Sequence, residues 1–167
     1  MVHENERLEH AYIPRGTFRN FSGAVSEFNK AGVRKFSILL PDEVAQEMEE
    51  IGWYIRHRPS RNEEDGTMNI LDIEASYDTK DGRFQPPIVK VISWDGAETL
   101  LKEETIGVLD HMDIEDATVE IRPYNWEVNG KSGCKAYLQQ MDVYARKPRR
   151  ALNASMRRNE DDEEDVF

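Results

Sequence analysis

An aromatic ring and several cations share one face of a short segment, residues 53–58 (WYIRHR). Residues two apart in an extended strand point to the same side, so Tyr54, Arg56 and Arg58 should form one face. Arg61 follows in the next loop. Flat rings stack on nucleic-acid bases while cations follow the phosphates, which is how surfaces bind single strands. The segment alone leaves open an ordinary solvent-facing strand with one amphipathic tyrosine.

A second set of the same kind lies nearer the end of the chain. Arg122, Tyr124 and Trp126 alternate along an apolar segment, and Lys131 and Lys135 follow across a predicted hairpin. Asn-Gly at 129–130 predicts the turn of that hairpin, because both central positions of a type I′ turn favour positive φ. These five residues are therefore candidates for the same binding surface.

Two further pairs combine an aromatic ring with a cation, Phe18 with Arg19 and Lys90 with Trp94. Some of these rings must fill the core, because a small domain needs several large side chains there. Tyr137 is ambiguous, because it shares its expected face with Lys135 but also with Met141 and Val143, which favours burial somewhat over base stacking.

The last nine residues, 159–167 (NEDDEEDVF), carry six consecutive carboxylates and end in Val166 and Phe167. Such a block cannot offset its ordering entropy, so we expect a mobile acidic tail, and blocks like it are often interaction tails. A tail that only aids solubility has no need of a terminal aromatic residue. Its candidate partner-binding residues are Asp161, Asp162, Glu163, Glu164, Asp165, Val166 and Phe167.

The net charge of −11 is not due to this tail. The six carboxylates of residues 159–167 are cancelled by six cations in residues 146–158, which leaves −11 on residues 1–145. That balance counts against a broad nucleic-acid footprint, because phosphate neutralisation supplies most non-specific affinity. Any nucleic-acid surface must be a local basic groove on an acidic protein.

The composition excludes several other classes. One cysteine, Cys134, precludes an internal disulfide and a cysteine-based zinc cluster. The start of the chain has no apolar core of a signal peptide, and no run approaches the roughly 18 apolar residues of a membrane span. With a mean hydropathy of −0.74, these features predict a soluble, cytoplasmic protein without membrane contact.

The sequence does not match the catalytic motifs with which it can be compared. Residues 130–132 (GKS) match the end of a phosphate-binding loop, but Asn125 stands where its first glycine is needed. We interpret the acidic cluster with His111 as solvated charges, and no histidine spacing is typical of a metal site. The sequence therefore predicts no enzyme, no cofactor and no metal.

The pattern of short apolar segments predicts a mainly β fold. Strands are expected at 35–40, 53–58, 69–77, 87–94, 118–126 and 135–144, after a short extended segment from Thr17. One short helix should run from Pro41 to Gly52, with Val44, Met48 and Ile51 inward, and another over about 102–112. These elements favour an OB-like Greek-key β-barrel with two short helices. The predicted divisions are a flexible N-terminal arm (1–14), the OB-like domain (15–145), a basic flexible linker (146–158) and the acidic tail (159–167).

The tail resembles the C-terminal tips of bacterial and phage single-stranded DNA-binding proteins, which end in a phenylalanine after an acidic run. That resemblance implies that Phe167 enters an apolar pocket on a replication or repair partner, with its carboxylate beside a basic residue. The body is similar to the phage-type proteins in its order of segments: FN…G.R.F, a helix ending in Gly-Trp, a Pro-Pro strand, LD…I and KAYL.

Together these features predict a non-enzymatic protein that coats single-stranded DNA with little sequence specificity. Its groove would be lined chiefly by Tyr54, Arg56, Arg58, Arg122, Tyr124 and Trp126. Its tail would recruit replication or recombination proteins, in the host cytoplasm if the protein is phage-encoded. The alternatives are an acidic protein-binding or DNA-mimic inhibitor module and an RNA-binding OB domain. A homo-oligomer is compatible with the sequence, which leaves the oligomeric state open.

Overall fold

The computed structural model describes residues 1–27, 29–62, 64, 66–78 and 85–148. The predicted acidic tail and all but the first three residues of the predicted linker lie outside these residues. The described part is mainly β, with nine strands in one sheet, one α-helix and the 3-10 helix η2. The elements are β1 (Glu6–Leu8), β2 (Arg19–Asn20), β3 (Lys35–Leu40), α1 (Asp42–Ile51), β4 (Arg56–Pro59), β5 (Thr67–Glu74), β6 (Ile88–Ile92), β7 (Glu98–Leu101), η2 (Ile106–Asp110), β8 (Ile114–Val128) and β9 (Lys131–Ala145).

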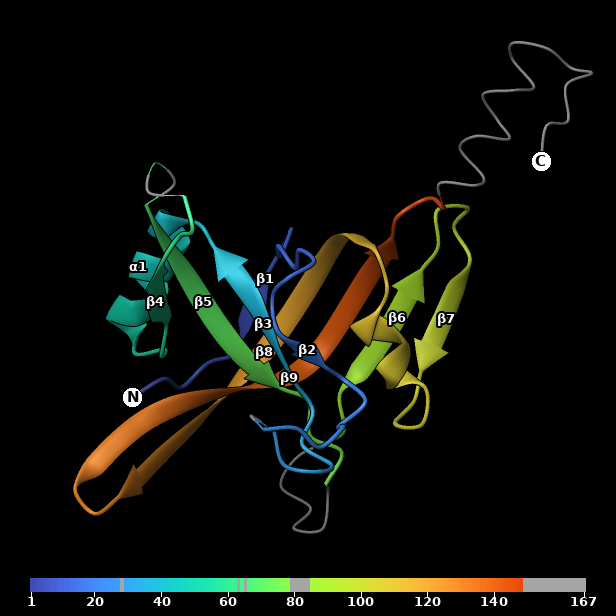
Figure 1. The fold of residues 1–167 in the computed structure, drawn as a ribbon. Coiled ribbons are helices and arrows are strands. Elements are labelled where there is room, and N and C mark those ends of the chain that lie inside the picture. Colours follow the sequence, from blue (N-terminus) through green and yellow to red (C-terminus); the bar gives the residue numbers. More distant parts are fainter. Residues whose placement is uncertain (28, 63, 65, 79–84, 149–167) are drawn as a thin grey trace, which may run out of the picture.

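The antiparallel hairpin of β8 and β9 is the longest element of the fold, and its tip extends beyond the rest of the sheet (Figure 1). Asn129 and Gly130 have φ angles of 52° and 79°, as the predicted type I′ turn requires. The pairing shifts register between Glu120 and Ile121, so β9 has one extra residue at that point. Such a β-bulge reverses the inward and outward faces along the strand.

Four strands and the start of the chain close an OB-like barrel, which confirms the predicted fold class. β9 pairs with β8 on one side and in parallel with β5 on the other, and β5 pairs with β3. From β3 the contact returns to β8 through the N-terminal segment. Tyr12 bridges Leu39 of β3, the Ala11 N–H donates to the Ala117 carbonyl of β8, and β1 pairs with β8.

The prediction of a flexible arm over residues 1–14 is therefore wrong. Val2, Leu8 and Ile13 are buried in the core, with 2% of Val2 exposed. The Val2 N–H donates to Asn125 Oδ1 at 3.2 Å, and Asn125 Nδ2 donates to the Val2 carbonyl at 2.7 Å. Leu8 pairs with Val119 and Val2 bonds Asn125, partners that follow by a hundred residues or more, and no local periodicity reveals such contacts.

The predicted helix between Pro41 and Gly52 is confirmed as α1. Gly52 ends it with φ 127°, and its N–H donates to the carbonyls of Met48 and Glu49. The inward face differs from the expected one, because Ala45 and Met48 are buried whereas Ile51 is half exposed. The set of α1 residues that faces the core is therefore rotated about the helix axis relative to the predicted set.

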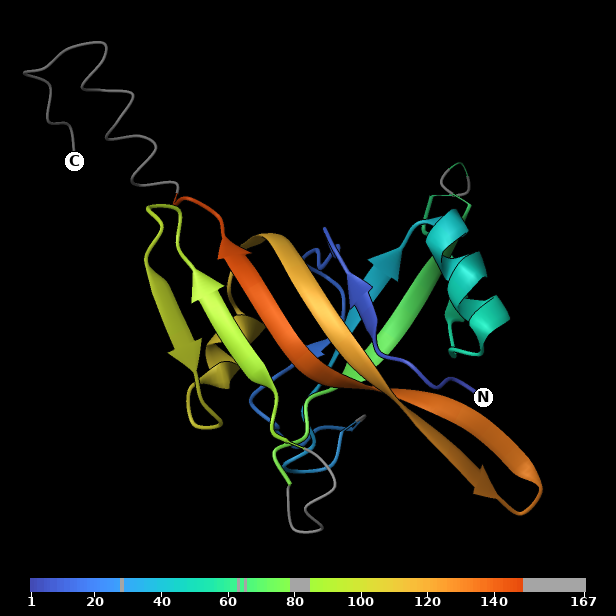
Figure 2. The ribbon, with the colours of Figure 1, turned by 180° about the vertical axis from the view of Figure 1, so that it is seen from behind.

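The second predicted helix, about 102–112, is only the short 3-10 helix η2. Its expected inward residues Ile106 and Leu109 are buried. The residues just before it form β7, which the sequence pattern does not predict. β7 pairs with β6, and β6 continues the sheet beside the second half of β9. We call the ribbon of β6 and β7 the wing; Figure 2 shows it at the opposite side of the molecule from α1. No helix among the described residues is long and apolar enough to span a membrane.

Candidate nucleic-acid interface

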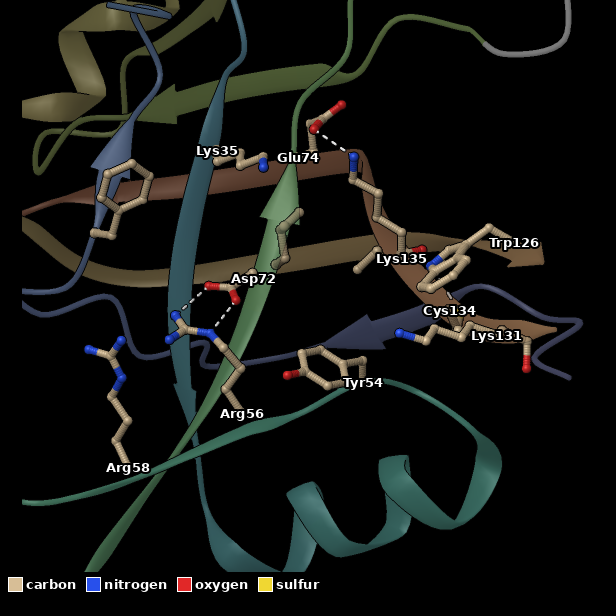
Figure 3. A pocket seen from close by; sticks show the side chains of 15 residues that line it. Lys35, Tyr54, Arg56, Arg58, Asp72, Glu74, Trp126, Lys131, Cys134 and Lys135 are labelled. Atoms are coloured by element: carbon tan, nitrogen blue, oxygen red, sulfur yellow. Dashed lines mark hydrogen bonds and ion pairs between the residues drawn. The ribbon is translucent and has the colours of Figure 1, made fainter. Parts of the chain in front are cut away.

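A groove of about 950 Å³ lies between β4 and β5 on one side and the outer part of the β8–β9 hairpin on the other (Figure 3). Its rings are Phe18, Tyr54 and Trp126, which are 41%, 64% and 39% exposed. The remaining lining residues are Lys35, Arg56, Arg58, Asp72, Ile73, Glu74, Lys131, Ser132, Gly133, Cys134, Lys135 and Ala136. Seven of the thirteen predicted binding residues line this one groove: Phe18, Tyr54, Arg56, Arg58, Trp126, Lys131 and Lys135.

The β4 side of the groove has the geometry that its alternation predicts. Tyr54, Arg56 and Arg58 all line the groove, whereas Trp53 and Ile55, which alternate with them, are buried in the core. Burial of the two apolar residues anchors the segment and turns the ring and both guanidinium groups outward. In the view of Figure 3, Tyr54 lies between Arg56 and Lys131.

On the hairpin side, Trp126 lies over the backbone of the opposite strand. It pairs with Gly133, where an added Cβ would lie 2.7 Å from Cζ2 of the indole. No side chain fits there without moving the ring, so glycine at 133 permits the indole to lie flat on β9. Lys131 and Ser132 continue the groove toward the hairpin turn.

Asp72 of β5 holds Arg56 in the floor of the groove. Arg56 Nε donates to Oδ2 at 2.5 Å and Nη2 to Oδ1 at 2.9 Å, while Ser37 Oγ donates to Oδ1 at 2.6 Å. Burial acts to raise the pKa of Asp72, but the hydrogen bonds from Arg56 and Ser37 outweigh it and leave the pKa below its usual value. The bidentate pair fixes Arg56 in place.

Glu74 forms the second ion pair of the floor, with Lys135 Nζ at 2.9 Å. Burial acts to lower the pKa of Lys135, but the hydrogen bond and charge of Glu74 prevail and raise it above the usual value. Lys135 Nζ also lies 5.2 Å from the ring centroid of Tyr137, within cation–π range.

The groove is cationic although the protein is acidic. Its lining includes five cations and the two carboxylates just described. Lys35, Arg58 and Lys131 form no ion pair with any residue that the structure describes. These three charges are therefore available to an anionic ligand. They form the local basic groove that the sequence analysis expects on an acidic protein.

Arg122 and Tyr124 lie outside the groove lining and pack with Tyr137 instead. The Arg122 guanidinium is 4.9 Å from the Tyr137 centroid, and Tyr124 meets the same ring edge-on at 5.8 Å. Arg122 is only 8% exposed. Tyr137 is half-buried on this face while Met141 is in the core, because the bulge places the two residues on opposite faces. The expectation that Tyr137 is buried on the same face as Met141 is therefore wrong.

Four other predicted residues lie away from the groove. Arg19 is a structural residue, since its guanidinium donates to the carbonyls of Ile13, Leu109 and Met112. Arg61 is exposed in the loop after β4 and does not line the groove. The other two, Lys90 and Trp94, belong to β6 of the wing and to the turn that follows it.

Three charged groove residues were not among the predicted site residues: Lys35, Asp72 and Glu74. All three alternate with core residues in strands that the sequence does predict, so the sequence pattern alone indicates that their side chains point away from the core. Their place in the groove depends on the pairing of β5 with β3 and β4, which no local pattern specifies.

Comparison with known proteins is consistent with this geometry. No curated protein sequence is significantly similar to the chain. Two solved structures of the single-stranded DNA-binding protein from bacteriophage Enc34 share the fold. The form in complex with ssDNA is 12% identical, with TM-score 0.53 over 86% of this chain and 88% of that one. The C-terminally truncated form is 11% identical, with TM-score 0.52 over 86% and 87%.

The sequence also matches a family model, described as "Putative phage ssDNA-binding domain", over residues 2–153. This match spans most of the chain, including the N-terminal segment that closes the barrel. It confirms the resemblance seen in the order of segments, whereas the tail at 159–167 lies beyond the matched residues. The chain belongs to the phage ssDNA-binding domain family.

Proposed function

We propose that the groove binds single-stranded DNA with little sequence specificity. The observation that carries this proposal is the gathering of three exposed rings, Phe18, Tyr54 and Trp126, in one cationic groove. Rings from three separate parts of the chain line it, together with charges that have no ion-pair partner among the described residues. Membership of the phage ssDNA-binding domain family, and the Enc34 relative solved with ssDNA, support the proposal.

Bases would stack on the rings while the phosphates meet Lys35, Arg58 and Lys131. Base–aromatic stacking contributes about 1–3 kcal/mol per base and tolerates every sequence, because every base has a π face. Three phosphate contacts give an expected slope of log K against log salt of roughly −2. The Arg56–Asp72 and Lys135–Glu74 pairs would keep their cations oriented rather than supply free charge.

The test is titration of tryptophan fluorescence with oligo-dT at two salt concentrations. Trp126 lines the groove, Trp53 is buried, and Trp94 lies on the wing. Because the three indoles have different surroundings, single substitutions can assign a fluorescence change to one of them. We expect quenching in the wild type and in W94F, and its loss in W126F. Absence of quenching in the wild type at low salt would overturn the proposal.

The same titration separates the alternatives. An acidic DNA mimic should not bind oligonucleotides even after removal of residues 159–167. Competition between matched dT and rU oligomers distinguishes a DNA binder from an RNA-binding OB domain, because stacking alone is indifferent to the sugar.

Recruitment of replication or recombination proteins is the second part of the proposal, and it rests on the sequence of residues 159–167. Phe167 would enter an apolar pocket of the partner while the carboxylates meet its basic rim. Changing Phe167 to Ala should abolish pull-down of those enzymes and leave oligo-dT affinity unchanged. Retained capture would remove this part of the proposal without affecting DNA binding.

The charge of the tail also gives it a way to compete with DNA for the groove. Deletion of residues 159–167 should then raise ssDNA affinity at low salt, where charge attraction is least screened. Equal or weaker binding by the deletion variant would exclude this competition.

A further inference from the structure

The wing ends in a strand whose outer edge has no partner among the described residues. β7 pairs only with β6, with Leu100 opposite Lys90 and Glu98 opposite Ile92. Both ribbon views place β7 at the outer margin of the molecule (Figures 1 and 2). The edge is therefore accessible to another chain.

The hydrogen-bond pattern shows which backbone groups are at this edge. The Ser93 N–H donates to the Ala97 carbonyl at 2.8 Å, which marks a hydrogen-bonded pair in the β6–β7 register. Bonded and non-bonded pairs alternate in antiparallel sheets, so Thr99 and Leu101 direct their backbone groups toward β6. The N–H and C=O groups of Glu98 and Leu100 consequently face outward.

The β7 edge is less protected than another edge of the same sheet, since its four residues contain one charge, Glu98, and no proline. β4 also has a single neighbour, β5, but its sequence Arg-His-Arg-Pro combines charges with a proline. β7 reads Glu-Thr-Leu-Leu, and its Leu100 side chain is 56% exposed. Charges and proline are the usual means by which an edge strand avoids pairing.

The residues around Leu100 are complementary to themselves. In an antiparallel pair with a second copy, a two-fold axis at Leu100 places this residue against Leu100 of the other copy. The same register sets Glu98 against Lys102 of the second copy, and the reverse. Period 2 puts Glu98 and Leu100 on one face of β7, and Lys102 follows directly after the strand, where its backbone already bonds Thr105 and Ile106. The contact would therefore consist of one apolar pair flanked by two opposite-charge pairs of side chains.

We infer that β7 is a self-association edge, through which two copies of this chain pair antiparallel about Leu100. The inference goes beyond the proposed function, because no β7 residue lines the groove. A four-residue strand buries less than a standard interface, so the free protein should associate weakly. Two copies held on one DNA strand would associate more fully, since a shared strand raises their effective concentration.

Sedimentation velocity of the full-length chain without DNA, over a concentration series, tests the inference. The weight-average sedimentation coefficient should rise with concentration in the wild type and stay at the monomer value in L100K. E98K and K102E should each weaken association, whereas the double variant E98K/K102E should restore it by exchanging the charges. E47K, which makes the same charge change on the exposed face of α1, is the matched control and should associate like the wild type.

A wild type that stays monomeric at every concentration would overturn the inference, as would an L100K variant that associates normally. Failure of the double variant to recover association would also exclude the proposed register. Oligo-dT affinity of L100K, measured at concentrations where the wild type is monomeric, should equal that of the wild type. Loss of DNA binding by both proteins would instead count against the proposed function.

Discussion

The groove and the wing each present an exposed tryptophan near lysine, yet they differ in what surrounds the ring. Trp126 lines a groove with Phe18 and Tyr54, which come from distant parts of the chain. Trp94 lies in a turn of the two-stranded wing, and Lys147 Nζ already lies 5.0 Å from its ring centroid. The aromatic and cationic composition is alike in the two regions, whereas the groove described above is lined by residues of the first.

This difference indicates that ring-and-cation patterns identify strand faces, while binding surfaces arise from how strands are brought together. We expect single-stranded DNA to distinguish the two regions clearly. Four experiments test that expectation, in order of decreasing effect.

Removal of two groove rings should have the largest effect. Y54A/W126A should lose at least about thirtyfold in oligo-dT affinity, because each ring contributes about 1–3 kcal/mol to stacking. The matched variant W94A/Y144A removes Trp94 of the wing and the exposed Tyr144 of the neighbouring strand β9, and it should stay within about twofold of wild type. Fluorescence anisotropy with labelled oligo-dT measures both. Equal losses in the two variants would remove the distinction between groove and wing.

Displacing one ring without removing it should have a smaller effect. In G133V the new side chain would occupy the space of the Trp126 indole, so the ring must leave the backbone of β9. We expect a loss of about tenfold in oligo-dT affinity, within the range for one stacked base. Q140V places the same branched side chain at an exposed position of β9 outside the groove and should bind nearly normally. Thermal melting of both variants checks that the barrel is intact; a folded G133V with full affinity would contradict the role of the ring.

Loss of one unpaired cation should change the salt dependence more visibly than the affinity. K131Q should reduce the magnitude of the slope of log K against log salt by about 0.7, the amount expected for one phosphate contact with a single strand. K90Q on the wing should leave the slope unchanged. Titrations at four salt concentrations give both slopes. A larger change of slope in K90Q than in K131Q would indicate that the DNA phosphates contact the wing and not the groove.

The smallest effect concerns acid stability. The pKa of Asp72 is below its usual value of 3.8, so its ion pair stabilises the folded state above that pH and is lost as the pH falls through the lowered pKa. D72N should therefore be less stable at neutral pH and show a shallower fall in Tm on acidification below about pH 5. In the wing turn, the hydrogen bond from Ser93 also lowers the pKa of Asp95, but that group is fully exposed. D95N should change the profile little, because solvent screens such contacts. Thermal melts from pH 7 to pH 3 compare the two.

Local patterns were sufficient for much of the fold. The face of Tyr54, Arg56 and Arg58 follows from period 2, and the hairpin turn follows from the preference of Asn129 and Gly130 for positive φ. Both depend on residues close in sequence. The OB-like class followed from the number and spacing of such segments.

Non-local pairing explains what the patterns did not predict. The extra residue in β9 reverses a face within one continuous strand, which placed Tyr137 wrongly beside Met141. Arg19 is of a residue type common in DNA-binding sites, but its guanidinium donates hydrogen bonds to three carbonyls from other segments. The four residues of β7 are too few for a period to be recognised, and they become a strand through pairing with β6.

The N-terminal segment that closes the barrel has a consequence for synthesis of the protein. The backbone of Val2 bonds the side chain of Asn125, and Ala11 bonds Ala117. These early residues must therefore wait for strand β8 before they reach their places. Contacts this distant in sequence also slow folding. We expect the nascent chain to remain incompletely folded, and open to proteases, until β8 has emerged.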